Sequence, residues 1–304
     1  KQKTKKIALG LKSPLVGPKI EDEEYLRGLF LEQGLSVTAL NNYLTCPWRY
    51  FFTNLIRIPE VPSKFQLYGT AVHEALRDSF SRSSGKKPSK KIFLELFSNY
   101  LKKKPLNRED YAECLKKGIK SLGGYFDRYA ANWQRPVITE FKIAGVFVPI
   151  RTAEGEKNIL LKGVLDKLEL LSGNAVNVVD YKTSKPKTRN EISGLTKNSD
   201  GSYKRQLVFY KLLLESYEKG KYSMTSAEID FTESDPKGEY RKERFLIEQS
   251  EVAALRGVIE KTAYEIYSFA FWGNECSKPL CEYCRLRKSF IQKPLPSLTQ
   301  ELRQ

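Results

Sequence analysis

The stretch LKGVLDKLELLSGNAVNVVDYKTSK, from Leu161 to Lys185, decides the fold of this chain. Segments 158–171 and 175–182 are rich in Leu and Val, and the tripeptide SGN between them supplies a short glycine turn. These features predict two antiparallel strands joined as a hairpin. Pairing that is symmetric about the central glycine places Asp166 opposite Asp180, so two carboxylates are expected to be cross-strand neighbours.

A third charged side chain joins these acids. Side chains of a strand alternate between its faces, so Lys182 shares a face with Asp180 while Tyr181 points to the other face. Like charges opposite each other destabilise a sheet, and a divalent cation such as Mg²⁺ would offset the repulsion because it binds carboxylate oxygens. The alternative is a solvated strand face on which Lys182 neutralises Asp180, and the spacing alone favours neither reading.

Composition narrows the class of partner. The chain has 304 residues, with 52 Lys and Arg against 36 Asp and Glu, a net charge of +16 and a pI near 9.4. Such a surplus favours a polyanionic partner, either nucleic acid or an anionic membrane surface. No apolar run approaches a membrane span and no signal-peptide core is evident at the start, so nucleic acid is the preferred partner and no membrane is expected.

The cysteines bear on the cellular compartment of the protein, and the first residue bears on whether the sequence is a fragment. Five cysteines at uneven spacing, without a secretory signal, fit a reducing compartment, and we expect a cytoplasmic protein. The chain does not begin with Met, which is consistent with a fragment of a larger protein.

The order of patterns suggests one main domain over residues 36–290. Residues 1–35 are basic, then acidic, and are expected to form a linker or arm, and residues 291–304 a tail. Before the hairpin we predict a helix capped by Ser36 or Thr38, a helix from near Gly69, a helical insertion over about 89–133 and a strand. After the hairpin we predict a polar basic loop over 184–205, a helix from Gln206 and a second hairpin. A helix over 248–272 and a cysteine-containing segment over 276–290 complete the domain.

Four further residues are candidates for the site around the acidic hairpin. His73, the only histidine, follows Gly69 on its helix; a lone helical histidine is usually structural, but histidine is also a frequent metal ligand. Gln206 and Tyr210 are four residues apart, share one helix face, and could reach a phosphate or the hairpin lysine, although Tyr210 could equally be core. Glu140 could point toward the acids or could be an exposed strand glutamate.

Five motifs of the chain together resemble a known family. LNNYLTCPWRYFF, GTAVHEAL, GVLDKLEL, VVDYKTSK and QLVFY occur in the order found in the RecB-like branch of the PD-(D/E)XK nuclease superfamily. This branch includes the nuclease domains of bacterial helicase-nuclease complexes and the Cas4-type exonucleases. Each motif alone is moderately specific, but the ordered set is a strong signal over residues 36–290.

The resemblance implies a fold, an activity and a set of roles. It implies an α/β fold with a mixed central β-sheet flanked by helices, as in restriction endonucleases. It implies a metal-dependent DNA nuclease, in particular an exonuclease of DNA repair and recombination, with DNA and a helicase domain or subunit as partners. A catalytically inactive DNA-binding or scaffold module of a helicase complex is the alternative. The implied ligands of Mg²⁺ or Mn²⁺ are His73, Asp166, Asp180 and the backbone carbonyl of Tyr181; Lys182 would orient or activate water, and Gln206 and Tyr210 would organise the lysine and the phosphate.

The cysteines depart from the family pattern. Many RecB-like nucleases hold an iron-sulfur cluster with one early cysteine and three late ones that end in C-x2-C-x5-C. Cys46, Cys281 and Cys284 match three of these positions, but Phe290 occupies the last. Cys276 could supply the fourth thiolate of a [4Fe–4S] cluster. Alternatively, the cluster is lost and apolar packing that includes Phe290 holds the segment; zinc is a third reading.

Overall fold

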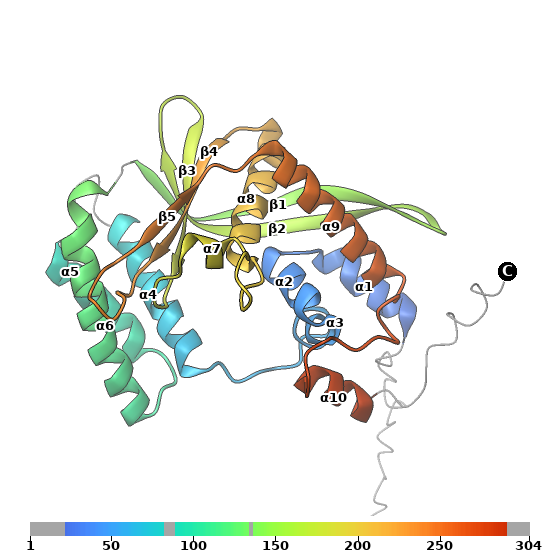
Figure 1. Cartoon of the computed structure of the whole chain (residues 1–304), viewed down its shortest axis with the longest axis horizontal. Helices are drawn as coiled ribbons and strands as arrows, with labels where there is room; N and C mark the ends of the chain where they lie inside the picture. The colour runs from blue at the N-terminus through green and yellow to red at the C-terminus, as the bar shows by residue number, and fades with distance from the viewer. Residues whose placement is uncertain (1–21, 82–88, 134–135, 291–304) are drawn as a thin grey trace, which may run out of the picture.

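A five-stranded mixed β-sheet organises the chain (Figure 1), which the computed structural model describes over residues 22–81, 89–133 and 136–290. The strand order is β1-β2-β3-β4-β5, with β3 and β4 parallel and the other neighbours antiparallel. The predicted α/β fold with a mixed sheet and flanking helices is therefore confirmed. The strands are β1 (Val137–Thr152), β2 (Gly155–Leu170), β3 (Ala175–Lys182), β4 (Ser223–Phe231) and β5 (Lys242–Phe245).

The β2–β3 hairpin has the predicted register. Lys167 pairs with Val179, one step along the ladder from Asp166 and Asp180. Asp166 remains attached to β3 because its Oδ2 atom accepts a hydrogen bond of 2.8 Å from the backbone N–H of Tyr181. The two acids thus lie beside each other where the ladder ends.

Helices cover both faces of the sheet. One buried cluster joins α4 (Lys64–Ser81), α5 (Lys90–Lys102) and α6 (Arg108–Tyr129) to Val179 and Tyr181 of β3. The other joins α2 (Val37–Thr45), α8 (Ser202–Ser216) and α9 (Gln249–Tyr267) to Val176 and Val178 of the same strand. Figure 1 shows α4, α5 and α6 together at one end of the molecule, while the long β1–β2 hairpin runs past α1 and α9 toward the other.

The prediction of an N-terminal arm is wrong for part of its length. Residues Glu23–Gln33 form helix α1, whose Leu26 and Phe30 are fully buried in the core. Gly34 ends this helix with φ +62°, and a side chain there would collide with the carbonyl oxygen of Leu160. The arm prediction failed because α1 acquires its buried face only by docking on β2. Residues 1–21 and the predicted tail 291–304 lie outside the described residues.

Other boundaries follow the sequence patterns closely. Ser36 caps α2 through its side chain, as predicted. Helix α4 begins at Lys64, five residues before the expected start, and the predicted helical region 89–133 contains α5, α6 and a short turn. The shorter elements are α3 (Pro47–Tyr50), η1 (Phe51–Leu55), η2 (Ala130–Asn132), α7 (Arg189–Ile192), η3 (Tyr217–Lys219) and α10 (Glu282–Phe290).

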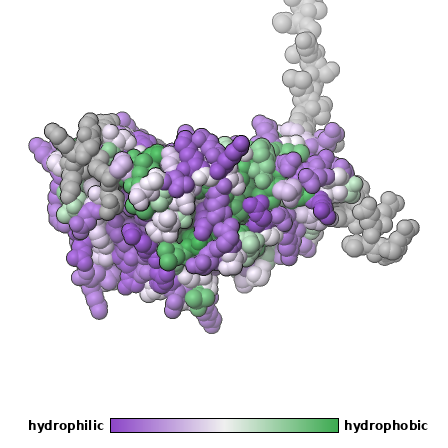
Figure 2. Space-filling model, turned by 90° about the horizontal axis from the view of Figure 1, so that it is seen from above, coloured by the Kyte–Doolittle hydropathy of each residue, from purple (hydrophilic) through white to green (hydrophobic). Residues whose placement is uncertain are grey.

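The surface is mostly hydrophilic on the face shown in Figure 2, where apolar patches interrupt a largely polar covering. Among the described residues, no helix has both the length and the apolar character needed to cross a bilayer.

Candidate active site and cysteine cluster

A pocket of about 290 Å³ opens where the β2–β3 hairpin meets α4 and α8. The hairpin contributes its acids and lysine, α4 contributes the histidine, and α8 contributes polar side chains from its first turns. The lining residues that matter here are His73, Asp166, Asp180, Lys182, Tyr203 and Gln206.

One side of the site is a cluster of potential metal ligands. Ligand atoms of His73, Glu140 and Asp166 all lie within 4.8 Å of one another, and His73 Nδ1 is 3.4 Å from Asp166 Oδ1. Imidazole nitrogen and carboxylate oxygen form a donor set suited to Mn²⁺ or Mg²⁺, so these residues fit a divalent cation. Glu140 was left undecided by the sequence, and the structure places it in this cluster.

The backbone of Glu140 supports a functional role for this residue. Its φ of +52° lies in the left-handed region, which costs a residue with a side chain about 1–3 kcal/mol inside a strand. Such strain persists where surrounding structure demands a particular side-chain direction. Here the result is that the carboxylate of Glu140 lies beside Asp166 and His73.

The other side of the site is a hydrogen-bonded network around Lys182. Its Nζ atom lies 2.7 Å from Asp180 Oδ2 and 2.7 Å from Gln206 Oε1. The amide nitrogen of Gln206 donates to Asp180 Oδ1 at 2.7 Å and to the hydroxyl of Tyr210 at 2.6 Å. The structure therefore joins all four of these predicted site residues in one network.

Burial and charge set the protonation of this network. Burial raises the pKa of Asp180, and the ammonium of Lys182 opposes that shift. Burial lowers the pKa of Lys182, but the charge and hydrogen bond of Asp180 outweigh it and raise the pKa above its ordinary value. Lys182 is consequently a cation at neutral pH, able to orient water or stabilise negative charge but not to accept a proton.

The histidine and the third acid are shifted in the same direction. Burial lowers the pKa of His73, but the hydrogen bond and charge of Asp166 raise it by more than burial lowers it. The net pKa of His73 therefore lies above its ordinary value. Burial and the charge of Asp166 raise the pKa of Glu140. The negative charge of Asp166 contributes to both shifts, and a bound cation would offset that charge.

Close backbone packing brings α4 to this site. A side chain at Gly69 would approach the hydroxyl of Thr183 to 3.0 Å, directly after the strand that carries Lys182. Glycine therefore lets α4 lie close enough to the hairpin for His73 to reach Asp166.

A groove of about 530 Å³ adjoins the pocket and shares Asp166 and Gln206 with it. Lys142 and Lys162 line this groove, on neighbouring strands β1 and β2. Two ammonium groups beside the acidic pocket offer a path for a polyanion.

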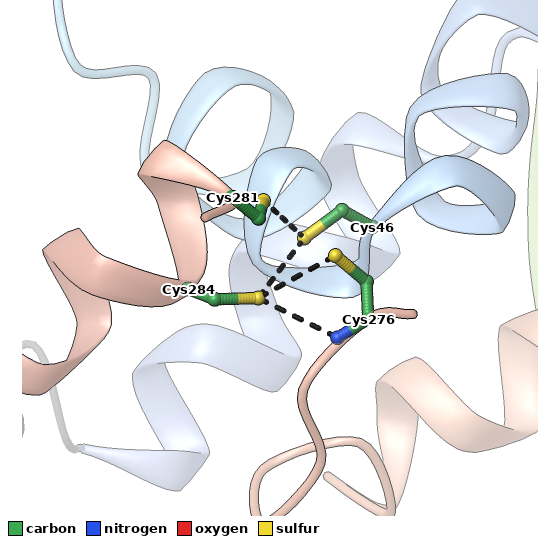
Figure 3. Close-up of side chains that lie close together, drawn as sticks. All are labelled: Cys46, Cys276, Cys281 and Cys284. Carbon is green, nitrogen blue, oxygen red and sulfur yellow. Dashed lines mark hydrogen bonds between the residues drawn. The ribbon is translucent and has the colours of Figure 1, made fainter. Parts of the chain in front are cut away.

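The other chemically notable feature is a cluster of four cysteines (Figure 3). Cys46 lies between α2 and α3, Cys281 just before α10, Cys284 within it, and Cys276 upstream. The Sγ of Cys46 is 3.7 Å from the Sγ atoms of Cys281 and Cys284, and Cys284 is 3.6 Å from Cys276. Cys276 thus lies close enough to the other three cysteines to serve as the fourth ligand in place of a cysteine at position 290.

The thiols of this cluster lie in unlike environments. Burial raises the pKa of Cys46. Burial also opposes ionisation of Cys281, but hydrogen bonds from the backbone of Cys284 and from neighbouring thiols lower its pKa to about 7. A stabilised thiolate within a group of four cysteines is chemically suited to metal binding.

Comparison with known proteins gives a family match. A family model described as "PD-(D/E)XK nuclease superfamily" matches residues 34–289. No curated protein matches the chain. Among solved structures, a "Putative exonuclease" from Eubacterium rectale is 12% identical, with 93% of this chain and 96% of that chain covered at a TM-score of 0.49. The protein SSO0001 is 14% identical, with 79% and 83% covered at a TM-score of 0.29. The family match spans most of the chain and includes every residue of the pocket and the cysteine cluster.

Proposed function

The chain belongs to the PD-(D/E)XK nuclease superfamily, and from this premise we propose that it is a deoxyribonuclease that depends on Mg²⁺ or Mn²⁺. The observation that carries the proposal is the ion pair of Lys182 with Asp180, held by Gln206 beside the cluster of His73, Glu140 and Asp166. A pure binding surface would not need a group of acids where a phosphate must approach, because those acids repel DNA.

The proposed ligands of the divalent cation are His73, Asp166, Asp180 and the backbone carbonyl of Tyr181, with Glu140 as an additional carboxylate. When bound, the cation would polarise a phosphate oxygen and lower the pKa of a bound water. The N–H of Tyr181 fixes Asp166 by its Oδ2 atom, and His73 contacts the other oxygen. These two contacts fix the carboxylate of Asp166 in position beside His73 and Glu140.

Lys182 is proposed to act on the reacting phosphate as a permanent cation. Its ammonium would orient the attacking water and stabilise the charge that develops on phosphate oxygens in the transition state. Gln206 keeps that ammonium in place through its carbonyl oxygen and fixes Asp180 through its amide nitrogen. Tyr210, buried on the same helix face, holds the amide of Gln206.

The experiment is cleavage of end-labelled linear DNA, single- and double-stranded, beside a covalently closed circle, with Mg²⁺, Mn²⁺ or EDTA. Lys182→Ala is the test variant, and Lys120→Ala, which removes an exposed lysine on α6, is the matched control. We expect metal-dependent cleavage that Lys182→Ala abolishes and Lys120→Ala retains. Tight, salt-sensitive binding without cleavage in either metal would instead identify a DNA-binding scaffold.

The finer features of the activity rest on the motif resemblance to the RecB-like branch. We propose exonuclease action, a role in DNA repair and recombination, and association with a helicase fused upstream or bound in trans. Degradation of linear DNA with the circle left intact would support exonuclease action. Stimulation of duplex degradation by ATP in the full-length protein would support the helicase association, and ATP-independent degradation would contradict it.

We also propose that Cys46, Cys276, Cys281 and Cys284 hold a metal centre that joins the C-terminal segment to the N-terminal helices. Four thiolates around a single Zn²⁺ are about 3.8 Å apart, given tetrahedral Zn–S bonds of roughly 2.3 Å. The contacts of 3.6 to 3.7 Å match that separation. A [4Fe–4S] cluster must fit four irons and four sulfides between the same sulfurs, which would have to move apart, so the distances between the sulfurs favour zinc over an iron-sulfur cluster.

Metal analysis of protein purified without oxygen separates these readings. We expect about one Zn per chain in the wild type and its loss in Cys276→Ser. About four Fe per chain with visible absorption would establish the iron-sulfur cluster instead, and a metal-free wild-type protein would show that packing alone holds the segment.

A further inference from the structure

One aromatic ring at the mouth of the catalytic pocket contacts two lysines. The Nζ atoms of Lys182 and Lys187 each lie 4.6 Å from the ring centroid of Tyr203, well within the range of cation–π attraction. Tyr203 lies on α8 and lines the pocket. The ring is backed by Phe231 of β4, at 6.4 Å between centroids.

Helix geometry makes Tyr203 the third member of the functional face of α8. Tyr203, Gln206 and Tyr210 are spaced at i, i+3 and i+7, so all three project from one face of the helix toward the end of β3. Gln206 and Tyr210 contact Asp180 through hydrogen bonds, whereas Tyr203 offers Lys182 its ring.

The contacts of Lys182 give the ring a specific task. An ammonium has three donors, and two directions are used by Asp180 Oδ2 and Gln206 Oε1, each at 2.7 Å. The ring of Tyr203 limits where the remaining N–H can point. Without the ring, the lysine side chain could swing away from the phosphate whenever Asp180 turns toward a metal.

Lys187 differs from Lys182 in having no direct ion pair. Within residues 22–81, 89–133 and 136–290, no carboxylate oxygen lies within 4.0 Å of its ammonium, whereas Asp180 contacts Lys182 directly. Glu191 is a more distant neighbour, since hydrogen bonds from Thr188 and, to a smaller extent, the charge of Lys187 lower the pKa of Glu191. The two ammonium groups are at most twice 4.6 Å apart, because both lie at that distance from one centroid. A cation without a direct ion pair is therefore held close to Lys182 at the mouth of the pocket.

We propose that Tyr203 is a positioning residue that fixes Lys182 toward the scissile phosphate and holds Lys187 to bind a neighbouring phosphate of the same strand. This inference rests on the proposed nuclease function and adds a second phosphate-binding position to it. Lys187 compensates part of the negative charge of the pocket before any substrate arrives, so it contributes mainly to binding, whereas Tyr203 contributes through Lys182 to the chemical step.

The test for Tyr203 compares Tyr203→Leu with Tyr203→Phe, measuring kcat and KM separately on a labelled single-stranded oligonucleotide. We expect Tyr203→Leu to lower kcat by about tenfold to thirtyfold, and Tyr203→Phe, which retains the ring, to restore most of that loss. Thermal unfolding of each variant monitors the fold. Equal kcat for the Leu variant and the wild type, or equal losses in the Leu and Phe variants, would overturn the positioning role.

The test for Lys187 uses Lys187→Gln beside Lys197→Gln, which removes an exposed lysine of the same loop. Binding of single-stranded DNA is measured at several salt concentrations with Ca²⁺ in place of Mg²⁺. We expect Lys187→Gln to raise KM more than it lowers kcat and to reduce the slope of log Kd against log salt by about 0.7, with the slope unchanged in Lys197→Gln. Equal slopes for Lys187→Gln and wild type would overturn the phosphate contact.

Failure of this inference is distinguishable from failure of the proposed function. A wild-type protein that does not cleave DNA refutes the nuclease proposal and the role of Tyr203 together. Cleavage that depends on Lys182 but is insensitive to Tyr203→Leu refutes only the positioning role.

Discussion

Replacement of Gln206 by Leu removes the residue that connects the catalytic lysine to its acid. Gln206 accepts from Lys182 at 2.7 Å, donates to Asp180 at 2.7 Å and donates to Tyr210 at 2.6 Å. Leu keeps a side chain of similar size and loses all three bonds. Two of them involve a charged partner, and each such bond contributes about 1.5–3 kcal/mol. Because these bonds are coupled, their values do not add.

The loss of one such bond in the transition state predicts the rate effect. At about 1.4 kcal/mol for each factor of ten, 1.5–3 kcal/mol corresponds to a fall of roughly 10-fold to 150-fold in kcat/KM. The assay is initial-rate degradation of end-labelled single-stranded DNA in Mn²⁺, with circular dichroism to verify the fold.

The matched control is Gln249→Leu on α9, where an exposed amide donates a hydrogen bond of 3.3 Å to Glu215. We expect that variant to retain wild-type kcat/KM. If Gln206→Leu remained within about threefold of the wild type, the network would not support the transition state and our assignment of Gln206 would be refuted.

Three other variants and conditions test the site and the core. Burial lowers the pKa of His73, but two neighbouring aspartates raise it by more, so protons compete with the metal for His73 below that raised pKa. The Mn²⁺ concentration that gives half-maximal activity should therefore decrease as the pH is raised from about 6 to about 8. A concentration that does not change with pH would contradict ligation by His73. Leu26→Ala should lower the urea-measured free energy of unfolding by about 2–5 kcal/mol because Leu26 is fully buried; a loss below about 1 kcal/mol would show that α1 is not part of the core. Lys167→Met should lower the free energy of unfolding by about 3–5 kcal/mol because it removes the ammonium 2.9 Å from buried Glu169, whose other oxygen still accepts from Asn177; adding Glu169→Leu should recover much of the loss, and a single variant as stable as wild type would refute the pairing.

The sequence predicted the centre of the sheet well because its signals are local. Alternation and the SGN turn determine the register of the β2–β3 hairpin, and the observed pairing of Lys167 with Val179 follows from them. The same register brings Asp166 beside β3. The alternation of side chains and the residues of the turn act within about 25 residues, so the register can be predicted without the rest of the chain.

Features that depend on distant contacts were missed or left open. The start of α4 at Lys64 and the burial of α1 arise from packing that no local pattern records. Glu140 was ambiguous because its position beside Asp166 depends on the pairing of β1 with β2, which no local pattern around Glu140 records. Tyr203 was overlooked, although its spacing of three residues from Gln206 on a predicted helix was a usable signal.

The residues of the pocket could be predicted from their types and spacing, but the way in which they come together in space could not. His73, Asp166, Asp180, Lys182 and Gln206 were all candidates from the sequence, and the structure brings them together. Their roles as ligands and catalysts remain predictions. The sequence could not establish a fourth cysteine ligand, because position 290 carries Phe and the contact of Cys276 with Cys284 appears only in the structure.

The two faces of the sheet contribute unequally to the pocket, and this has a consequence for the timing of activity during synthesis. His73 arrives on α4 from one helical layer, whereas Gln206 and Tyr210 arrive on α8 from the other. A growing chain therefore carries its acids and lysine before it carries the whole of α8, whose side chains hold them in place. A chain that ends before α8 would lack the bonds of Gln206 to Lys182 and Asp180, so the proposed cleavage would require both layers to fold around the sheet.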